Sequence, residues 1–164
     1  MSSVLIDVGL YKDKIMSHLL ESDDLRKVLL RKDKYTDDEV DDLIYNQVFP
    51  YLYIDDTQTE VKSFVCFEID VRVDGNIKTM TLTSYIYAHK ECMKNNLEGY
   101  LGTTVDILSD IFERQIGSCI KDFGIGKWDL DSTWHTFPNN SYYGKTLSFT
   151  TSDFKTKVKW KWLN

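Results

Sequence analysis

The sequence lacks the features of a membrane protein, a secreted protein and a disulfide-bonded scaffold. It contains no run of about 18 apolar residues, so no helix is predicted to cross a membrane. The first residues carry neither the basic stretch nor the apolar core of a secretory signal. The three cysteines, Cys66, Cys92 and Cys119, are an odd number at wide spacing and form no CxxC pair. We therefore expect a soluble protein made in a cytoplasm, with reduced thiols and no zinc site.

An excess of positive charge is also absent. The net charge is −6, and the acidity is concentrated in residues 1–60, which carry 14 acids and 7 bases, whereas residues 61–164 carry 12 acids and 13 bases. This balance disfavours a general nucleic-acid-binding surface, whose affinity depends on neutralising phosphates. It is typical of a solvated helical flank or of a surface that faces a basic partner.

The length and composition favour one folded unit. A chain of 164 residues that is 42% hydrophobic is of a size that buries roughly two thirds of its unfolded surface in one core. We expect a single α+β domain over residues 1–154. A basic and aromatic strand or tail follows at residues 155–164.

Helices are predicted for the N-terminal third. Apolar residues recur at helical spacing over residues 7–20. Ser22, followed by two aspartates, is predicted to cap a short helix that ends near Leu30. The sequence "TDDE" at residues 36–39 has the spacing of a capping box, which predicts a third helix that includes Val48.

A long β-hairpin is the clearest prediction. Residues 61–73 alternate between apolar and polar side chains, which predicts a strand with one buried face. A type II′ turn at Gly75-Asn76 sets the register of the second arm. The predicted opposite pairs are Val71 with Met80, Ile69 with Leu82, and Val65 with Ile86. Arms of roughly 12 residues exceed the usual 5–6, so the far end is expected to project from the domain.

The second half of the chain completes an α+β order. A polar loop at residues 95–102 precedes a helix that Thr103 or Thr104 caps and that ends near Gly117. Its apolar face is predicted to cover the sheet. Two further strands are expected, one around residues 128–134 and one beginning at Gly144. The fold class is therefore α+β, a mostly antiparallel sheet with a long hairpin, packed against one main helix and N-terminal helices.

Five carboxylates around the start of the hairpin invite a catalytic interpretation: Asp55, Asp56, Glu60, Glu68 and Asp70. A metal-dependent nuclease needs two or three carboxylates that converge on Mg²⁺, usually with a lysine at the phosphate. No lysine completes such a motif on the strand, and Glu68 and Asp70 point away from the apolar stripe. We therefore expect no enzymatic activity, no metal and no cofactor, and we interpret these acids as an exposed contact surface.

The C-terminal sequence "KTKVKWKWLN" alternates cationic and mostly apolar side chains. Lys155, Lys157, Lys159 and Lys161 fall on one face of a strand, and Val158, Trp160 and Trp162 fall on the other. Three interpretations follow: the segment packs on its own sheet, adds a strand to a neighbouring copy, or lines a channel that contacts DNA. The second interpretation pairs these lysines with the acidic N-terminal third of a neighbour.

The order of elements resembles a known class of phage proteins. The phrases that carry the resemblance are "PYLYIDDTQTE", the hairpin "VKSFVCFEIDVRVDGNIKTMTLTSYIYAH", the helix "TVDILSDIFERQI" and "PNNSYYGK". Together they make residues 5–154 similar to the small neck and tail-completion proteins of tailed phages and prophages of low-GC Gram-positive bacteria. Tail terminators are the nearest functional class, and the tail at residues 155–164 lies outside the resemblance.

The resemblance implies a structural virion protein without enzymatic activity. Its copies would form a ring, typically hexameric, that caps the tail tube protein and docks it to the head-side connector protein. The protein would be made in the cytoplasm of the host bacterium and end in the virion, with no membrane contact. The predicted contact residues in the ring are the five acids, together with Lys155, Lys157, Lys159, Trp160, Lys161 and Trp162.

Alternatives remain open at the level of the sequence. Head-closure and adaptor proteins of the phage neck are also small ring formers, and the order of elements does not separate them from terminators. A metal-dependent nuclease centred on the acids is a hypothesis from a different class. A third hypothesis is a protein that binds a host factor through a structural fold.

Overall fold

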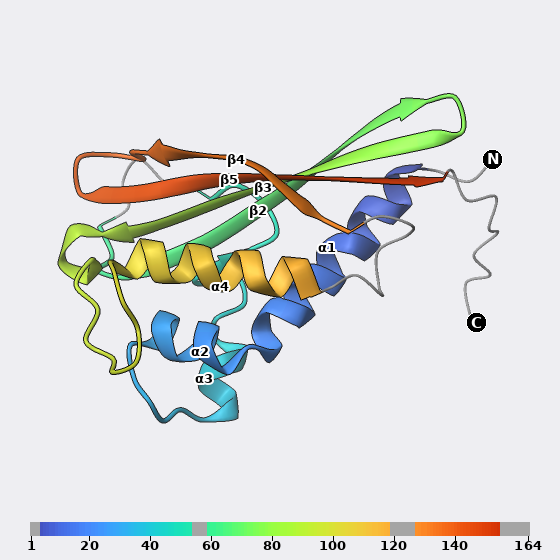
Figure 1. Cartoon of the computed structure of the whole chain (residues 1–164). Coiled ribbons are helices and arrows are strands. Elements are labelled where there is room, and N and C mark those ends of the chain that lie inside the picture. The colour runs from blue at the N-terminus through green and yellow to red at the C-terminus, as the bar shows by residue number, and fades with distance from the viewer. Residues whose placement is uncertain (1–3, 54–58, 119–126, 155–164) are drawn as a thin grey trace.

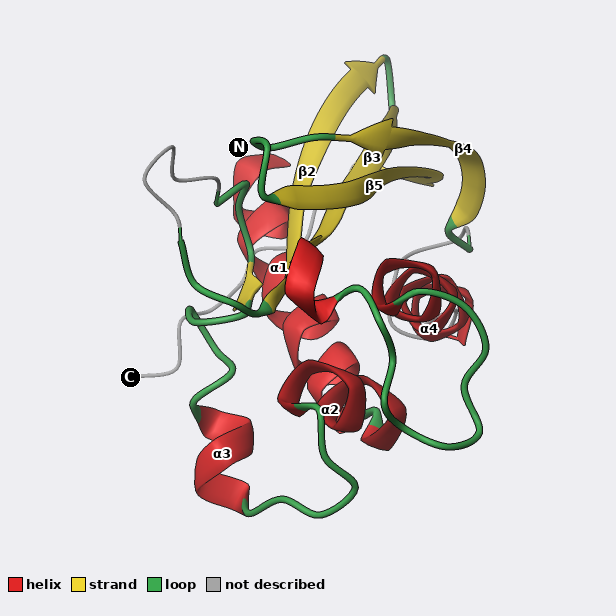
Figure 2. Cartoon of the chain, turned by 90° about the vertical axis from the view of Figure 1, so that its left-hand side faces the viewer, coloured by secondary structure: helices red, strands yellow, loops and turns green. Residues whose placement is uncertain are grey.

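A five-stranded sheet carries the helices on one side, as Figures 1 and 2 show from two directions. The computed structural model describes residues 4–53, 59–118 and 127–154. Its helices are α1 (Val4–Glu21), α2 (Asp23–Leu30), α3 (Asp37–Asp41), a short 3₁₀ helix (Lys90–Cys92) and α4 (Thr104–Ser118). Its strands are β1 (Val48–Phe49), β2 (Ser63–Asp74), β3 (Ile77–His89), β4 (Asp129–Thr136) and β5 (Tyr142–Phe154). The predicted α+β class is confirmed.

The strands lie in the order β1-β2-β3-β5-β4. All neighbouring pairs are antiparallel except β1 with β2, which is parallel. Helix α4 and strand β4 lie between β3 and β5 in the sequence, yet β5 pairs with β3, and β4 lies at the far edge of the sheet. The mostly antiparallel sheet is as predicted, whereas β1 was not foreseen.

The hairpin of β2 and β3 has the predicted register. Ile69 lies opposite Leu82, Val71 opposite Met80, and Val65 opposite Ile86. Gly75 has a φ of 57°, the left-handed region that the first turn position of a two-residue hairpin loop requires. The arms are 12 and 13 residues long, and Figure 1 shows their tip beyond the helical layer. The expected projection is confirmed.

The third helix is shorter than predicted. Thr36 and Glu39 form the expected capping box, in which the Glu39 carboxylate accepts from the Thr36 N–H at 3.0 Å. The helix ends at Asp41, however, and the chain reverses through Tyr45, whose φ is 56°. A helix cannot continue through a left-handed residue, so Val48 forms β1 instead of a helical turn.

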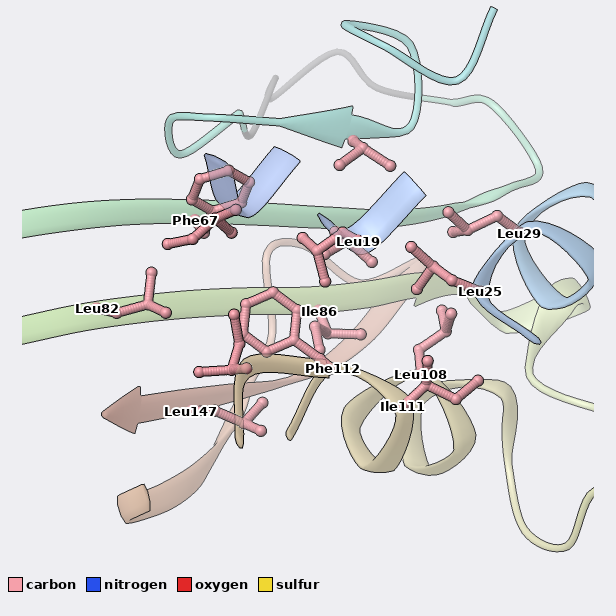
Figure 3. Close-up of a cluster of buried hydrophobic side chains, with 14 of the residues drawn as sticks. Leu19, Leu25, Leu29, Phe67, Leu82, Ile86, Leu108, Ile111, Phe112 and Leu147 are labelled. Atoms are coloured by element: carbon pink, nitrogen blue, oxygen red, sulfur yellow. The ribbon is translucent and has the colours of Figure 1, made fainter. Parts of the chain in front are cut away.

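The main core lies between the helices and the inner face of the sheet. Figure 3 shows Leu19 and Leu25 from the N-terminal helices and Phe112 from α4, all meeting strand side chains. The predicted apolar face of α4 is fully buried there: Val105, Leu108, Ile111, Phe112 and Ile116. This packing confirms that α4 covers the sheet.

A second cluster buries the opposite face of the hairpin at its base. Phe64 and Cys66 are 0% exposed there, so the prediction of one buried face for this strand was wrong near its start. The reason is the segment after β1, because Phe49 and Tyr53 stack with ring centroids 4.3 Å apart and cover this face. Burial raises the pKa of the Cys66 thiol to about 12. We call this set (Phe49, Tyr53, Phe64, Cys66, Tyr85, Tyr87, Tyr142) the aromatic cluster.

The start of α4 is fastened to β5 through Asp106. Thr103 caps the helix, because its Oγ1 accepts from the Asp106 N–H at 3.2 Å while its own N–H donates to the Asp106 carboxylate at 3.3 Å. The second carboxylate oxygen accepts from the Lys145 ammonium. Burial would raise the pKa of Asp106, but the bonds from Lys145 and Thr103 outweigh it and hold that pKa below its usual value.

Substituting Gly144 tests the aromatic cluster. Gly144 pairs with Tyr87, and a Cβ there would lie 2.5 Å from the Ile86 carbonyl oxygen and 2.7 Å from the Tyr87 Cβ. Gly144→Ala is therefore expected to lower the free energy of unfolding by about 1–3 kcal/mol in chemical denaturation. Gly9→Ala is the matched control, because a Cβ at Gly9 meets nothing within 4 Å and helix propensity alone should stabilise by about 0.5–1 kcal/mol. Equal effects from both variants would contradict the packing described.

Asp106→Asn tests the fastening of α4. The pKa of Asp106 lies below its unfolded value of about 3.9, so its contribution is present above that pH and disappears as the pH falls through the lowered folded-state pKa. Because the carboxylate is partly exposed, we expect a loss of only about 1 kcal/mol at pH 7. That loss should shrink toward pH 2.5. Urea denaturation at both pH values measures this, and a pH-independent loss would contradict the ion pair. Asp110→Asn, which removes an exposed i,i+4 pair, should cost at most about 0.5 kcal/mol.

Candidate functional site

The sheet face opposite the helices is open beyond the aromatic cluster. Neither Figure 1 nor Figure 2 shows a helix on this side. The side chains that β3 and β5 present there are small, hydroxylated and at least partly exposed: Thr79, Thr81, Thr83, Ser148, Thr150 and Ser152. On β4 the same face carries Trp134, whose side chain is 49% exposed. An exposed tryptophan is a residue type that is enriched where partner proteins bind.

Strand β2 leaves one edge open for most of its length. Strand β1 pairs only with Val65 and Cys66, and no other described strand lies on that side of residues 67–74. The Val65 N–H donates across this edge to the Gln47 carbonyl at 2.8 Å. Because backbone groups alternate along a strand, the N–H and C=O groups of Phe67, Ile69, Val71 and Val73 point the same way. We call residues 67–74 the open edge.

One backbone group of the open edge is bonded to a side chain. The Ile69 N–H donates to a Glu68 carboxylate oxygen at 3.0 Å, and the same oxygen forms an ion pair with Lys12 of α1. Charged side chains on an exposed edge are a common protection against unwanted strand pairing. The Glu68 carboxylate therefore protects the open edge at Ile69. Nearer the hairpin tip, no described side chain is bonded to the backbone of the open edge.

Apolar side chains gather near the hairpin tip. Val73 and Ile77 are 42% and 47% exposed. On α1, Leu5 is 75% exposed, and the neighbouring Asp7 carboxylate lies 2.6 Å from the Lys78 ammonium of β3. This contact holds the start of α1 beside the far end of the hairpin, on the face that carries Val73, whereas Ile77 pairs with Asp74 and lies on the opposite face.

Of the predicted acidic residues that the structure describes, Glu60 lies apart from Glu68 and Asp70. Glu68 and Asp70 share a face of β2, as the alternation predicts, and Asp70 is exposed. Glu60 lies at the other end of the sheet, where its carbonyl accepts from the Tyr142 hydroxyl at 2.6 Å and its carboxylate pairs with Lys62. Their role in contacts between copies stays a prediction.

Several predicted contact residues lie outside the described part of the chain. These are Asp55 and Asp56 before the hairpin, and the tail residues Lys155, Lys157, Lys159, Trp160, Lys161 and Trp162. Within the described ranges, no group of three or more His, Cys, Asp or Glu side chains is placed to hold a metal ion. Among those same residues no helix is long and apolar enough to cross a membrane.

The ion pair of Lys78 with Asp7 was missed by reasoning from the sequence. Lys78 is 1% exposed, and its ammonium also lies 5.3 Å from the centre of the Tyr11 ring. The sequence could have indicated this burial. Lys78 lies two residues before Met80 and four before Leu82, so alternation places it on the buried face of the predicted strand. A lysine on that face requires an internal partner.

A surface hollow of about 500 Å³ between α2, residues 98–101 and α4 carries several acids. Each of its aspartates is already bound. The Asp24 carboxylate accepts from the Tyr100 hydroxyl at 2.6 Å, Asp110 pairs with Arg114 at 3.0 Å, and Asp106 pairs with Lys145. The acids of the hollow are thus engaged in structural contacts, of which the Asp106–Lys145 pair joins α4 to the sheet, and the open edge and face remain the better candidate site.

Comparison with known proteins gives one family. The family model described as YomW matches residues 22–151, which is most of the chain. The matched range begins at the cap of α2 and ends within β5, so it leaves out α1 and the C-terminal tail. No curated protein matches the chain.

Amide hydrogen exchange tests the open edge. In dilute protein, where copies do not associate, the amides of Val71 and Val73 should exchange rapidly, because they face away from β3 and lie beyond the end of β1. Those of Glu68 and Asp70 should be protected, because they bond within the hairpin. The alternation can be read residue by residue by NMR. Protection of all four amides in dilute protein would contradict an open edge.

Proposed function

The chain belongs to the YomW family, which is associated with phages and prophages of Bacillus, and on that premise we propose that it is a structural virion protein of a tailed phage. The specific role is that of a tail-terminator or neck subunit. Copies assemble into a ring, hexameric as the resemblance implies, that joins the tail tube protein to the head-side connector protein.

The observation that carries this proposal is the open edge of β2 beside an uncovered sheet face. Folded monomers normally shorten, charge or cover such an edge, because unpaired backbone groups recruit other strands. Here only the Ile69 N–H has a described side-chain partner at the edge, the Glu68 carboxylate. Pairing between copies would satisfy the remaining groups.

A ring also needs two different surfaces on each copy. A contact that repeats head to tail joins one surface to another and closes if the rotation between copies allows it. The open edge lies on the β2 side of the sheet, whereas the exposed Trp134 lies on β4 at the opposite side. This separation of exposed surfaces supports a head-to-tail arrangement over a two-fold dimer.

The alternative within the same class is a head-closure or adaptor protein. Such proteins also form rings in the neck, and the same open sheet supports them. Loss of the protein distinguishes a terminator from a head-closure or adaptor protein. A terminator acts on the tail before heads and tails join, so only its loss should alter tail length.

Deleting the gene from an inducible prophage tests the proposal. We expect lysates with separate heads and tails, and electron microscopy should show tails of irregular length because nothing stops tube growth. Complementation from a plasmid should restore joined particles. Separate tails of uniform length would favour the head-closure or adaptor role, and infectious joined particles without the gene would contradict both.

Mass photometry tests ring formation directly. The purified chain, alone and mixed with tail tube protein, is expected to give a species near six times its mass of 19.2 kDa. The tube protein is included because the ring contact can require the tube end as a template. A strictly monomeric chain under both conditions would contradict assembly as a ring.

A further inference from the structure

The open edge presents two chemically different sides. On the outer face of the sheet, β2 carries Glu68, Asp70, Arg72 and Asp74, a net charge of −2. Within the described residues, Asp70 and Asp74 form no ion pair, whereas Glu68 pairs with Lys12. A strand that joins this edge would therefore meet unpaired negative charge on its outer side.

The inner side of the same edge is apolar. Val73 is 42% exposed there, next to the buried Ile69 and the partly buried Val71. The contact of Asp7 with Lys78 holds the start of α1 at this level, because Lys78 lies opposite Val73 in the hairpin. The exposed Leu5 of α1 adds to the apolar surface.

Residues 155–162 have the complementary pattern. A strand alternates its side chains between the two faces of a sheet, so Lys155, Lys157, Lys159 and Lys161 would share one face. Val158, Trp160 and Trp162 would share the other. We propose that residues 155–162 of one copy add as a strand to the open edge of a neighbouring copy, with the lysines against the acids and the apolar side chains against the inner side.

The lengths match, and the geometry favours a neighbour over the same chain. The tail segment and the open edge are each eight residues long. Strand β5 ends at Phe154, which pairs with Ile77 of β3, so two strand spacings of about 5 Å each separate it from the open edge of its own copy. A tail from another copy need not cross the hairpin tip. This contact rests on the proposed ring, to which it gives a donor and an acceptor on every copy.

Charge reversal in two separate variants tests the contact. The acceptor variant is Asp70→Lys with Asp74→Lys, and the donor variant is Lys157→Glu with Lys159→Glu. Each alone should weaken self-association at least about tenfold, because like charges then meet. Mixing the two should restore association, since each copy then finds a neighbour of opposite charge. Asp41→Lys with Asp42→Lys, at exposed positions on and after α3, is the matched control and should change nothing.

The same variants separate a neighbour from the chain's own tail. Association restored by mixing, measured by sedimentation velocity, supports the proposal. If mixing fails and association is restored only by one chain that carries both the acceptor and the donor substitutions, the tail binds its own copy. That result would overturn the proposal. Unchanged association in both variants, with folding verified by circular dichroism, would also overturn it.

A peptide experiment decides strand addition independently of ring formation. The synthetic peptide KTKVKWKWLN is added to the full-length donor variant, whose own tail no longer competes. Binding should protect the amides of Val71 and Val73 from exchange, and the donor variant with Asp70→Asn and Asp74→Asn added should bind at least about tenfold more weakly. No protection, with rings still formed by the unaltered chain, would overturn strand addition and leave the proposed function standing. Conversely, if the peptide protects these amides but deletion of the gene leaves virions unaffected, strand addition would stand and the proposed function would be overturned.

Discussion

The register of β2 against β3 determines how the rest of the molecule is arranged. Val65 opposite Ile86 and Ile69 opposite Leu82 place both apolar rows on one face. A slip of one residue would turn these rows to solvent and bring the threonines of β3 against the helices. With the register fixed, α1, α2 and α4 have one apolar surface to cover, and the other face remains polar beyond the aromatic cluster.

The burial of Lys78 shows how strongly this register acts. Lys78 shares a face with Met80 and Leu82, so the pairing that buries those two residues also buries a charged group. Such a group is costly to remove from water unless an opposite charge accompanies it. Asp7 supplies that charge from α1, at 2.6 Å. The ion pair thereby fixes the first turns of α1 near the hairpin tip, at the same end where β2 leaves its edge open.

Features set by neighbouring residues could be predicted from the sequence, whereas features set by distant ones could not. The turn at Gly75-Asn76 and the cap at Ser22 depend on a few adjacent residues, and both occur as expected. Strand β1 was missed because two residues carry no periodicity, and its partner Val65 lies far along the chain. The aromatic cluster was missed for the same reason, since only the fold brings residues 49–53 onto the hairpin.

The candidate site shows the same division. Alternation along β2 was enough to place Glu68 and Asp70 on one outward face. It could not show that Glu60 lies at the opposite end of the sheet, nor that β1 covers only the first part of β2, because both depend on contacts between distant parts of the chain. The strand order shows that Glu68 lies beside backbone groups that no described strand covers. Its carboxylate holds both the Ile69 N–H and Lys12, so an incoming strand must offer a backbone acceptor and a cation to replace them. In the proposed contact, an edge of this kind would resist uncharged strands and admit a lysine-bearing one, which would combine protection against aggregation with selective assembly.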